Sequence, residues 1–219
     1  MKAFILILFL LINIYVSRKI IGPIKYIDQT DSYPTGCESV STVMALHYLK
    51  VKISVDEFIQ KYLQKSKIQF KNNKMYAGDP RKVFVGSPYD KNSYGCYAPV
   101  IINALKRLLN KNNYIVKDLT GVSMKDLVKK YIDKKIPVIF WATIDLKASF
   151  NGSVWTIHGT NKTFTWKANE HCMLLVGYDN NKYYFNDPWG NHGVIGYDKK
   201  LVETRHKEQY SMAVAVYRK

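Results

Sequence analysis

The sequence is poor in cysteine: its 219 residues include three, Cys37, Cys96 and Cys172. An odd and sparse set of this kind is not a disulfide framework, and no two of the three have the spacing of zinc ligands. We therefore expect no metal and no other cofactor. At least one thiol is expected to be free, and a free thiol in a chain that carries export features calls for a functional explanation.

Acidic residues are also scarce, with 17 Asp and Glu against 33 Lys and Arg, which gives a formal net charge of +16. The excess is scattered lysine, often beside asparagine, as in residues 71–74. An arginine-rich stripe, zinc-finger spacing and an RNP-like aromatic motif are all missing, so nucleic acid is not the expected partner. The charge indicates either a solvated basic surface or attraction to an anionic cell wall or membrane.

Long hydrophobic runs are missing except at the start of the chain. Lys2 precedes an apolar run over residues 3–16, and Ser17, Arg18 and Lys19 follow it. This order is typical of an export signal, and the run of about 14 residues is short for a membrane span, which needs about 20. Because Arg18 and Lys19 stand where a cleavage site needs small residues, residues 1–19 are predicted to be either an export signal or a retained N-terminal anchor. A buried core helix is the other alternative. The protein is therefore expected outside the cell or at its surface.

Internal repeats and low-complexity segments are absent, and the 47% hydrophobic fraction can build the core of one domain or of two lobes. Periodicity and capping signals predict helices first and strands last, with a long polar loop, a candidate lid, over residues 65–95. The predicted helices cover residues 37–49, 54–63, 97–109 and 123–132; the predicted strands cover 114–118, 136–143, 170–178, 182–187, 194–197 and 211–217, with shorter strand and turn pieces in 144–170. This order predicts an α+β fold with an N-terminal helical part packed on a C-terminal antiparallel sheet.

Residues 28–40, D-Q-T-D-S-Y-P-T-G-C-E-S-V, contain the strongest chemical signal. A turn-forming stretch runs directly into Cys37, where an amphipathic helical pattern begins. The N–H groups and dipole of a helix N-terminus favour a thiolate over a thiol. Gln29, eight residues before Cys37, could supply a side-chain donor beside the sulfur. This combination suits a cysteine nucleophile.

A cysteine nucleophile needs a base within hydrogen-bond reach, usually a histidine. His47 lies on the helix of Cys37 at a distance of roughly 15 Å and cannot reach the sulfur. His206 lies in a charged run and is expected to be solvated, while His158 and His192 lie in turn-like contexts beside glycine. His171 begins an apolar strand, where a histidine needs a polar partner.

Asp187 ends the strand that follows the strand of His171. If residues 179–181 form the hairpin loop, with Tyr178 opposite Lys182, then His171 and Asp187 are diagonal neighbours on one face. A two-residue loop would move one of them to the other face. The same alternation directs Cys172 into the core, and Cys96 precedes an apolar helix with no base near it, so both are expected to be structural.

These residues define a candidate site for attack on a carbonyl. The Cys37 thiolate would be the nucleophile, His171 would form the ion pair and protonate the leaving group, and Asp187 would orient the imidazole. The Cys37 N–H and the Gln29 side chain would bind the oxyanion. The alternative is a buried cysteine in a helix and a strand histidine bonded to a core aspartate.

The motifs around these residues resemble those of the C39-like cysteine peptidases. The resemblance rests on Q-T-D-S-Y-P-T-G-C-E-S-V from Gln29, on G-D-P-R-K-V-F-V-G-S-P-Y from Gly78, and on H-C-M-L-L-V-G-Y-D and N-D-P-W-G between His171 and Gly190. It covers residues 24–217. It implies a papain-like α+β fold with a triad of Cys37, His171 and Asp187, and with Gln29 in the oxyanion hole.

The 219 residues contain no Walker A pattern and no transmembrane bundle. The spacing from Gln29 to Cys37 resembles the stand-alone exported branch of the family, so the double-glycine leader specificity of its transporter branch is not carried over. We expect a monomeric thiol peptidase that acts on peptide or isopeptide bonds in peptide or protein substrates. Two alternatives stay open: a cysteine amidase or acyl transferase on the same fold, and a non-catalytic basic module that binds the cell surface.

Overall fold

The computed structural model describes residues 18–219. The predicted export segment, residues 1–19, lies outside the described residues apart from its last two. Within the described part, no helix has the length and apolar character needed to cross a membrane.

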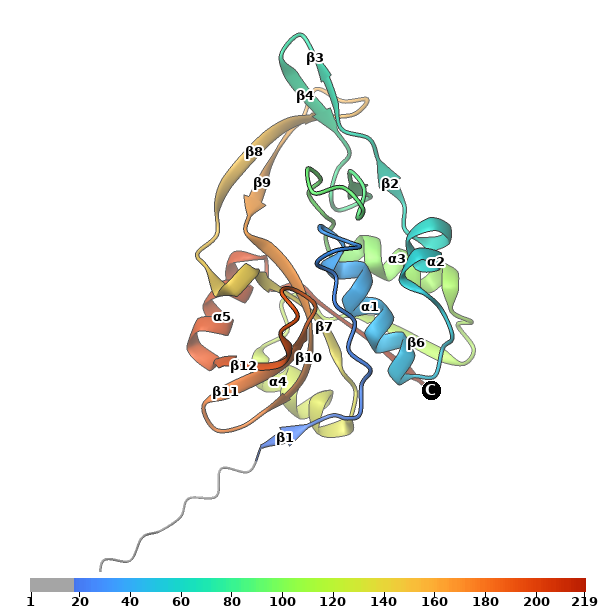
Figure 1. Ribbon diagram of the computed structural model, residues 1–219, viewed down its shortest axis with the longest axis vertical. Coiled ribbons are helices and arrows are strands. Elements are labelled where there is room, and N and C mark those ends of the chain that lie inside the picture. Colours follow the sequence, from blue (N-terminus) through green and yellow to red (C-terminus); the bar gives the residue numbers. More distant parts are fainter. Residues whose placement is uncertain (1–17) are drawn as a thin grey trace, which may run out of the picture.

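The main sheet is antiparallel and contains seven strands (Figure 1). Six of them follow the order β12-β11-β10-β7-β13-β6, and β1 pairs with β10 beside this path. The strands are β1 (Lys19–Ile20), β6 (Tyr114–Asp118), β7 (Val138–Thr143), β10 (Glu170–Tyr178), β11 (Lys182–Asp187), β12 (Gly193–Asp198) and β13 (Ala213–Arg218). The central strand β7 is buried along its whole length, as its continuous apolar run predicts.

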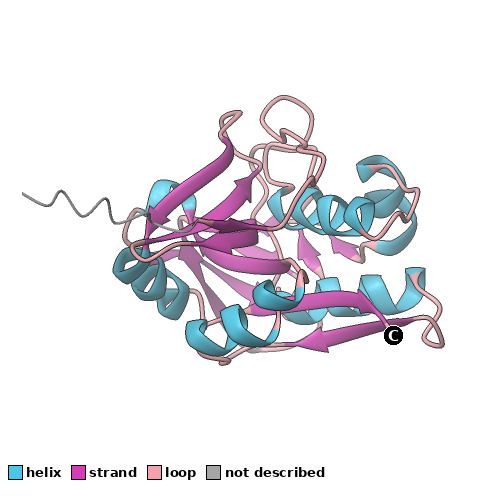
Figure 2. Ribbon diagram, turned by 90° about the horizontal axis from the view of Figure 1, so that it is seen from below, coloured by secondary structure: helices cyan, strands magenta, loops and turns pink. Residues whose placement is uncertain are grey.

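Helices cover both faces of this sheet (Figure 2). On one face α1 (Cys37–Tyr48) and α3 (Ala98–Leu108) form one hydrophobic core with Cys172, Leu174 and Val176 of β10. On the other face α4 (Met124–Lys130) and α5 (Lys199–Glu208) pack against Met173 and Leu175 of the same strand. Strand β10 therefore alternates between two cores, which is the α+β arrangement predicted from the sequence.

Two capping signals predicted helix starts correctly. The Ser54 hydroxyl accepts the Glu57 N–H at the start of α2 (Val55–Glu57), which continues as the π-helix Phe58–Tyr62. The Ser123 hydroxyl caps α4 in the same way. Two 3-10 turns, Ile132–Lys134 and Ile144–Leu146, precede and follow β7.

Residues 65–95, predicted to be a long structured loop, contain short strands instead. This segment contains β2 (Lys65–Ser66), β3 (Gln69–Lys71), β4 (Lys74–Ala77) and β5 (Phe84–Val85). Strands β3 and β4 join β8 (Phe150–Ile157) and β9 (Thr163–Ala168) in a second sheet, which projects from the body of the molecule at the top of Figure 1. The missed signal is Asn72-Asn73, both with positive φ, because asparagine pairs favour the tight turns that close hairpins.

Helix α5 is a further element that the charge pattern concealed. Its outer face is charged, but Val202 and His206, four residues apart, are both buried on the inner face. The prediction that His206 is solvated is wrong: the side chain is 3% exposed, and its ring stacks on Phe140 of β7 with the centroids 3.9 Å apart. A single helical turn of apolar contact was enough to anchor an otherwise polar helix.

The hairpin between β10 and β11 differs from the predicted register near its loop. Tyr178 pairs with Tyr183, not with Lys182, so the loop is one residue longer than predicted. A bulge between Leu175 and Gly177 absorbs the extra residue, and beyond it Leu174 pairs with Asn186 as the predicted register requires. The prediction was therefore wrong at the turn and correct at the end of the hairpin that carries His171 and Asp187.

Candidate active site

Cys37 is the first residue of α1 and follows Gly36, which caps the helix without a side-chain hydrogen bond. Its side chain is buried, and its thiol donates a hydrogen bond to Glu38 Oε2 at 3.4 Å. Burial, followed by the charges of Glu38 and Glu170, raises the pKa of the Cys37 thiol well above its usual value. The expectation that the helix N-terminus would favour the thiolate therefore does not hold for this conformation, because desolvation of the sulfur outweighs it.

His171 and Asp187 lie together, as the sequence predicted. The distance between His171 Nε2 and Asp187 Oδ1 is 2.7 Å, and each side chain is 1% exposed. Burial alone would raise the pKa of Asp187, but the charge and hydrogen bond of His171 and further donors hold it well below its usual range. Asp187 is therefore an ionised carboxylate that fixes the orientation of the imidazole.

Two further side chains hold the other oxygen of Asp187. The Tyr197 hydroxyl donates to Asp187 Oδ2 at 2.7 Å, and His192 Nδ1 lies 3.3 Å from the same atom. The Trp189 N–H donates to Oδ1 at 3.1 Å. The sequence analysis had set His192 aside as a turn residue; its position five residues after Asp187, within the tight turn of N-D-P-W-G-N-H, was the available signal.

The thiol and the imidazole lie against the same strand, β10. The Cys172 N–H, which directly follows His171, points to the Cys37 sulfur and lowers the pKa of the thiol slightly against the larger effects. The Ser41 hydroxyl of α1 also donates to the Cys172 carbonyl, at 3.1 Å. The recorded side-chain hydrogen bond of the thiol goes to Glu38, not to His171. The structure therefore brings both halves of the predicted site to one end of β10, with the thiol turned toward Glu38.

Gln29 is buried and lies beside the loop that follows Asp187. Its N–H donates to the Pro188 carbonyl at 2.9 Å. Its side-chain Nε2 donates to the carbonyls of Tyr33 and Pro34 at 3.3 and 3.4 Å, while Oε1 has no partner among the described residues. Gln29 thus stabilises the turn that leads into Cys37, and its role as an oxyanion donor stays a prediction.

Two buried carboxyl groups beside Cys37 were missed by the sequence analysis. Glu38 is fully buried and Glu170 is 8% exposed. The Cys37 sulfur and one oxygen of each carboxyl lie within 4.8 Å of one another. A metal ion could span such a distance, but both oxygens of Glu38 already accept hydrogen bonds, so we assign no metal here. One indication of them was present in the sequence: each glutamate is next to a candidate site residue, because Glu38 follows Cys37 and Glu170 precedes His171.

Cys96 and Cys172 are both fully buried in the core that contains α1. Burial raises the pKa of each thiol well above its usual value. The Cys96 N–H donates to Glu38 Oε1 at 2.5 Å. Their placement agrees with the structural role predicted for both.

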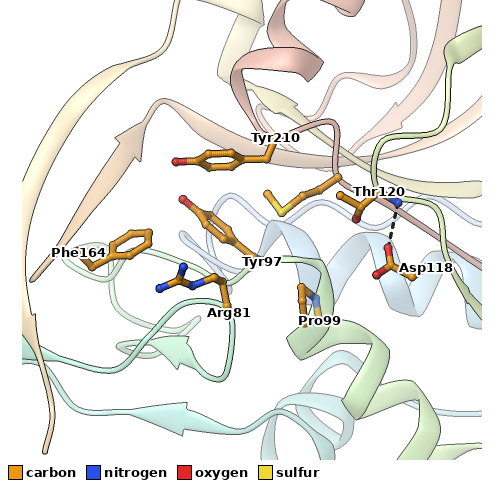
Figure 3. A pocket seen from close by; sticks show the side chains of 8 residues that line it. Arg81, Tyr97, Pro99, Asp118, Thr120, Phe164 and Tyr210 are labelled. Atoms are coloured by element: carbon orange, nitrogen blue, oxygen red, sulfur yellow. Dashed lines mark hydrogen bonds between the residues drawn. The ribbon is translucent and has the colours of Figure 1, made fainter. Parts of the chain in front are cut away.

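A separate pocket of about 340 Å³ is lined by Tyr97, Tyr210, Arg81 and Phe164, among others (Figure 3). Tyr97 stacks on Trp166 with the ring centroids 5.5 Å apart, and Tyr210 lies over Tyr97 at 5.4 Å. A Cβ atom added to Gly95 would lie 2.6 Å from Glu38 Oε1 and 3.4 Å from the Trp166 ring. Trp166 therefore lies close both to Tyr97, which lines the pocket, and to Gly95, which lies beside Glu38.

Comparison with known proteins identifies the family of the chain. A profile of the Peptidase_C39 like family matches residues 21–214. The Bacillus subtilis protein YvpB is 27% identical over 181 residues, which cover 83% of this chain and 68% of YvpB.

Two solved structures match the chain, one of them with a closely similar fold. A Bacillus anthracis protein assigned to the C39-like peptidases superposes with a TM-score of 0.78 at 24% identity, over 93% of this chain and 98% of that one. The peptidase domain of Streptococcus ComA, a bifunctional ABC transporter, gives a TM-score of 0.48 at 15% identity, over 90% of this chain and 98% of that one. The profile match spans nearly all of the described residues, and the chain belongs to the Peptidase_C39 like family, with the papain-like α+β fold of those peptidases.

Proposed function

We propose that the protein is a thiol peptidase that cleaves peptide or isopeptide bonds through Cys37, His171 and Asp187. The observation that carries this proposal is the buried His171–Asp187 pair at 2.7 Å on the strand against which the Cys37 thiol packs. A structural histidine in a core needs one partner, whereas this one is held by a carboxylate with three further donors. Such over-determination of one orientation is what a catalytic base requires.

The proposed reaction begins with rotation of the Cys37 thiol from Glu38 toward His171. The imidazole takes the thiol proton, and the sulfur attacks the substrate carbonyl to form a tetrahedral intermediate. The Cys37 N–H, at the first turn of α1, lies where a helix N-terminus stabilises an oxyanion. Collapse of the intermediate transfers the proton from His171 to the leaving amine and leaves a thioester, which water then hydrolyses.

The same first step serves an amidase or an acyl transferase. An amine that replaces water as the acceptor of the thioester converts hydrolysis into transfer. We place hydrolysis first because it needs no second substrate site. Residues 65–95 and 144–170 form the projecting sheet and its connections, and in this proposal they line the substrate groove.

The proposed site of action is outside the cytoplasmic membrane. The export features of residues 1–19 support it. The mass of the mature N-terminus, measured after expression in a secreting host, distinguishes a cleaved signal from a retained anchor.

The decisive experiment combines thiol labelling with a peptide library. The protein is treated with iodoacetamide near neutral pH, and the label on each cysteine is quantified by mass spectrometry. We expect Cys37 to react faster than the fully buried Cys96 and Cys172, and His171→Ala to slow it. Peptide libraries should be cleaved by the wild type and by Cys172→Ala, but not by Cys37→Ala. Equal, slow labelling of all three cysteines together with no thiol-dependent cleavage would overturn the proposal.

The net charge of +16 favours a second candidate, a basic module that binds an anionic wall or membrane and does not turn over substrate. In that case binding is independent of Cys37. Salt-dependent retention of the wild type and of Cys37→Ala on an anionic polymer tests this candidate.

A further inference from the structure

Glu38 and Glu170 meet inside the protein next to Cys37. A Cβ atom added to Gly95 would lie 2.6 Å from Glu38 Oε1 and 3.1 Å from Glu170 Oε2, so both carboxyls crowd the same point. Glu38 comes from the first turn of α1 and Glu170 from the first residue of β10. The pair therefore joins the element that carries the thiol to the element that carries the imidazole.

The surroundings of the pair provide donors for one carboxylate but not for two. Glu38 accepts hydrogen bonds at both oxygens, from the Cys96 N–H and from the Cys37 thiol. Glu170 Oε1 is buried and has no partner among the described residues. Among the described residues, no ion pair supplies a cation to Glu38 or Glu170. The titratable groups that face them are the thiols of Cys37, Cys96 and Cys172 and, toward Glu170, the Tyr97 hydroxyl.

Two adjacent, buried negative charges without a cation are strongly unfavourable, so the pair must hold a proton. Glu38, which accepts two hydrogen bonds, is suited to be the ionised member, and Glu170, which has an orphaned oxygen, is suited to be the protonated one. Burial raises the pKa of Glu38 to about 7. Burial, and then the charge of Glu38, raises the pKa of Glu170 well above its usual value.

We propose that Glu38 and Glu170 form an acid pair in which Glu170 keeps its proton through neutral pH and Glu38 is the member that ionises, and that the ionised Glu38 positions the Cys37 thiol and opposes its deprotonation. The two glutamates are positioning residues, since neither one touches the reacting carbonyl. The inference rests on the proposed role of Cys37 as the nucleophile. It adds a condition to that role: the sulfur must leave a negatively charged acceptor before it can pair with His171.

The test measures iodoacetamide labelling of Cys37 from pH 5 to 9 in four proteins: the wild type, Glu38→Gln, Glu170→Gln and Glu57→Gln. Glu38→Gln removes the charge beside the sulfur, so labelling at pH 8.5, where Glu38 is ionised in the wild type, should rise about tenfold, the change in thiolate fraction for a pKa shift of one unit. Glu170→Gln replaces a group that is already neutral, so its rate at pH 8.5 should stay within about threefold of the wild type. Glu57→Gln makes the same change in net charge at a half-buried side chain of α2, outside the site, and should have no effect.

The contrast between the two variants decides the inference. Equal acceleration of labelling by Glu38→Gln and Glu170→Gln would show that both groups are ionised. An unchanged pH profile in both variants would show that neither group acts on the thiol. Either result overturns the proposed acid pair. If a variant fails to fold by circular dichroism, the wild type still provides the answer. Carboxyl ¹³C spectra should show one glutamate protonated at pH 7 and a second titrating near neutrality, whereas titration of all glutamates near their usual pKa would overturn the proposal.

The outcome is separable from that of the proposed function. Labelling that follows the predicted pattern without peptide cleavage would leave the acid pair standing and remove the peptidase. Cleavage that depends on Cys37 with labelling indifferent to both glutamates would remove the acid pair alone.

Discussion

At the scale of single residues, Asp187 is the best-connected polar group of the site. Its carboxylate lies 2.7 Å from His171 Nε2 and accepts the Trp189 N–H and the Tyr197 hydroxyl. These contacts are the reason that it stays ionised while buried. A change in this carboxylate should therefore affect the imidazole first and the fold second.

We predict that Asp187→Asn lowers turnover by on the order of 10²–10⁴, because an amide presents the wrong partner to the histidine tautomer. Tyr197→Phe is the matched control, since it removes a hydrogen bond to the other oxygen and leaves His171 its carboxylate. Its loss of turnover should be smaller. Steady-state kinetics on any peptide found in the library, together with thermal unfolding, checks both. Unfolding of Asp187→Asn with no separate loss of turnover would identify the carboxylate as structural.

Cys172 offers a second test at this scale. Its side chain is fully buried beside α1, and Cys172→Ala removes one buried sulfur atom. We expect a loss of about 1 kcal/mol in the free energy of unfolding, from the burial and packing lost with one atom group. Urea denaturation measures this, and Cys37 labelling should keep its rate. A large fall in labelling would mean that Cys172 takes part in the chemistry.

The sequence singled out Cys37, His171 and Asp187 as the proposed nucleophile, base and orienting carboxylate because each lies in a recognisable local pattern. Glu38 and Glu170 have no such pattern of their own. A glutamate in the first turn of a helix is ordinarily an exposed group that favours the helix dipole. Here the first turn is buried against β10, and only the tertiary contact between α1 and β10 shows that the two carboxyls meet.

At the scale of elements, α5 is held to the sheet by His206. Burial lowers the pKa of His206 from 6.5 to about 4, although the Trp141 carbonyl partly offsets this. The folded state therefore favours the neutral imidazole, and its contribution is complete above pH 6.5 and is lost as the pH falls through about 4. Protonation of His206 lowers the free energy of unfolding by on the order of 3 kcal/mol, at about 1.4 kcal/mol per pKa unit.

We predict that His206→Asn is less stable than the wild type at pH 7, since the stacking on Phe140 is lost. The difference between the two proteins in the free energy of unfolding should become smaller toward pH 4.5. Urea unfolding at pH 7 and 4.5 gives the two differences. Groups that titrate elsewhere in the molecule are common to both proteins and cancel. A gap that is the same at both pH values would contradict the assignment of the acid sensitivity to His206.

The attachment of β1 to β10 depends on Gly177. A Cβ atom at this position would lie 2.3 Å from the Lys19 carbonyl oxygen and 2.9 Å from Ile20 Cα, both of which are backbone atoms. We predict that Gly177→Ala displaces β1 and speeds hydrogen exchange at the Ile21 N–H, which donates to the Val176 carbonyl at 2.7 Å. Cys37 labelling should be unaffected. Unchanged exchange at Ile21 would show that the strand can accommodate a methyl group.

The elements with strong periodicity or caps were predictable, and those held by pairing alone were not. Helix α1 begins at Cys37, as predicted, because a turn sequence precedes an apolar stripe. Strands β3 and β4 carry few buried residues, so hydrophobic alternation could not reveal them. The bulge at Val176 had no signal in the sequence. The predicted register returns at Leu174 and Asn186 because the bulge cancels the longer loop.

At the scale of the whole molecule, the charge of +16 makes a prediction that does not depend on the site. Retention on a phosphate-bearing polymer resin should fall steeply between about 0.05 and 0.5 M NaCl, as the Debye length shrinks below about 10 Å. Cys37→Ala should be retained equally. Retention that persists at high salt, or that requires Cys37, would rule out an electrostatic surface-binding role.

The pairing of β1 with β10 also has a mechanical consequence. The ladder consists of two residue pairs, Lys19 with Tyr178 and Ile20 with Gly177, at the end of β10 that is remote from His171. Tension applied to the chain at its N-terminal side therefore enters the sheet through this ladder, at the far end of the strand from the site. A ladder of two residue pairs breaks under a smaller force than a long central ladder, so β1 would detach from β10 before the rest of the sheet is disrupted. A pull on the N-terminal segment would peel β1 away and leave the His171–Asp187 pair unstrained.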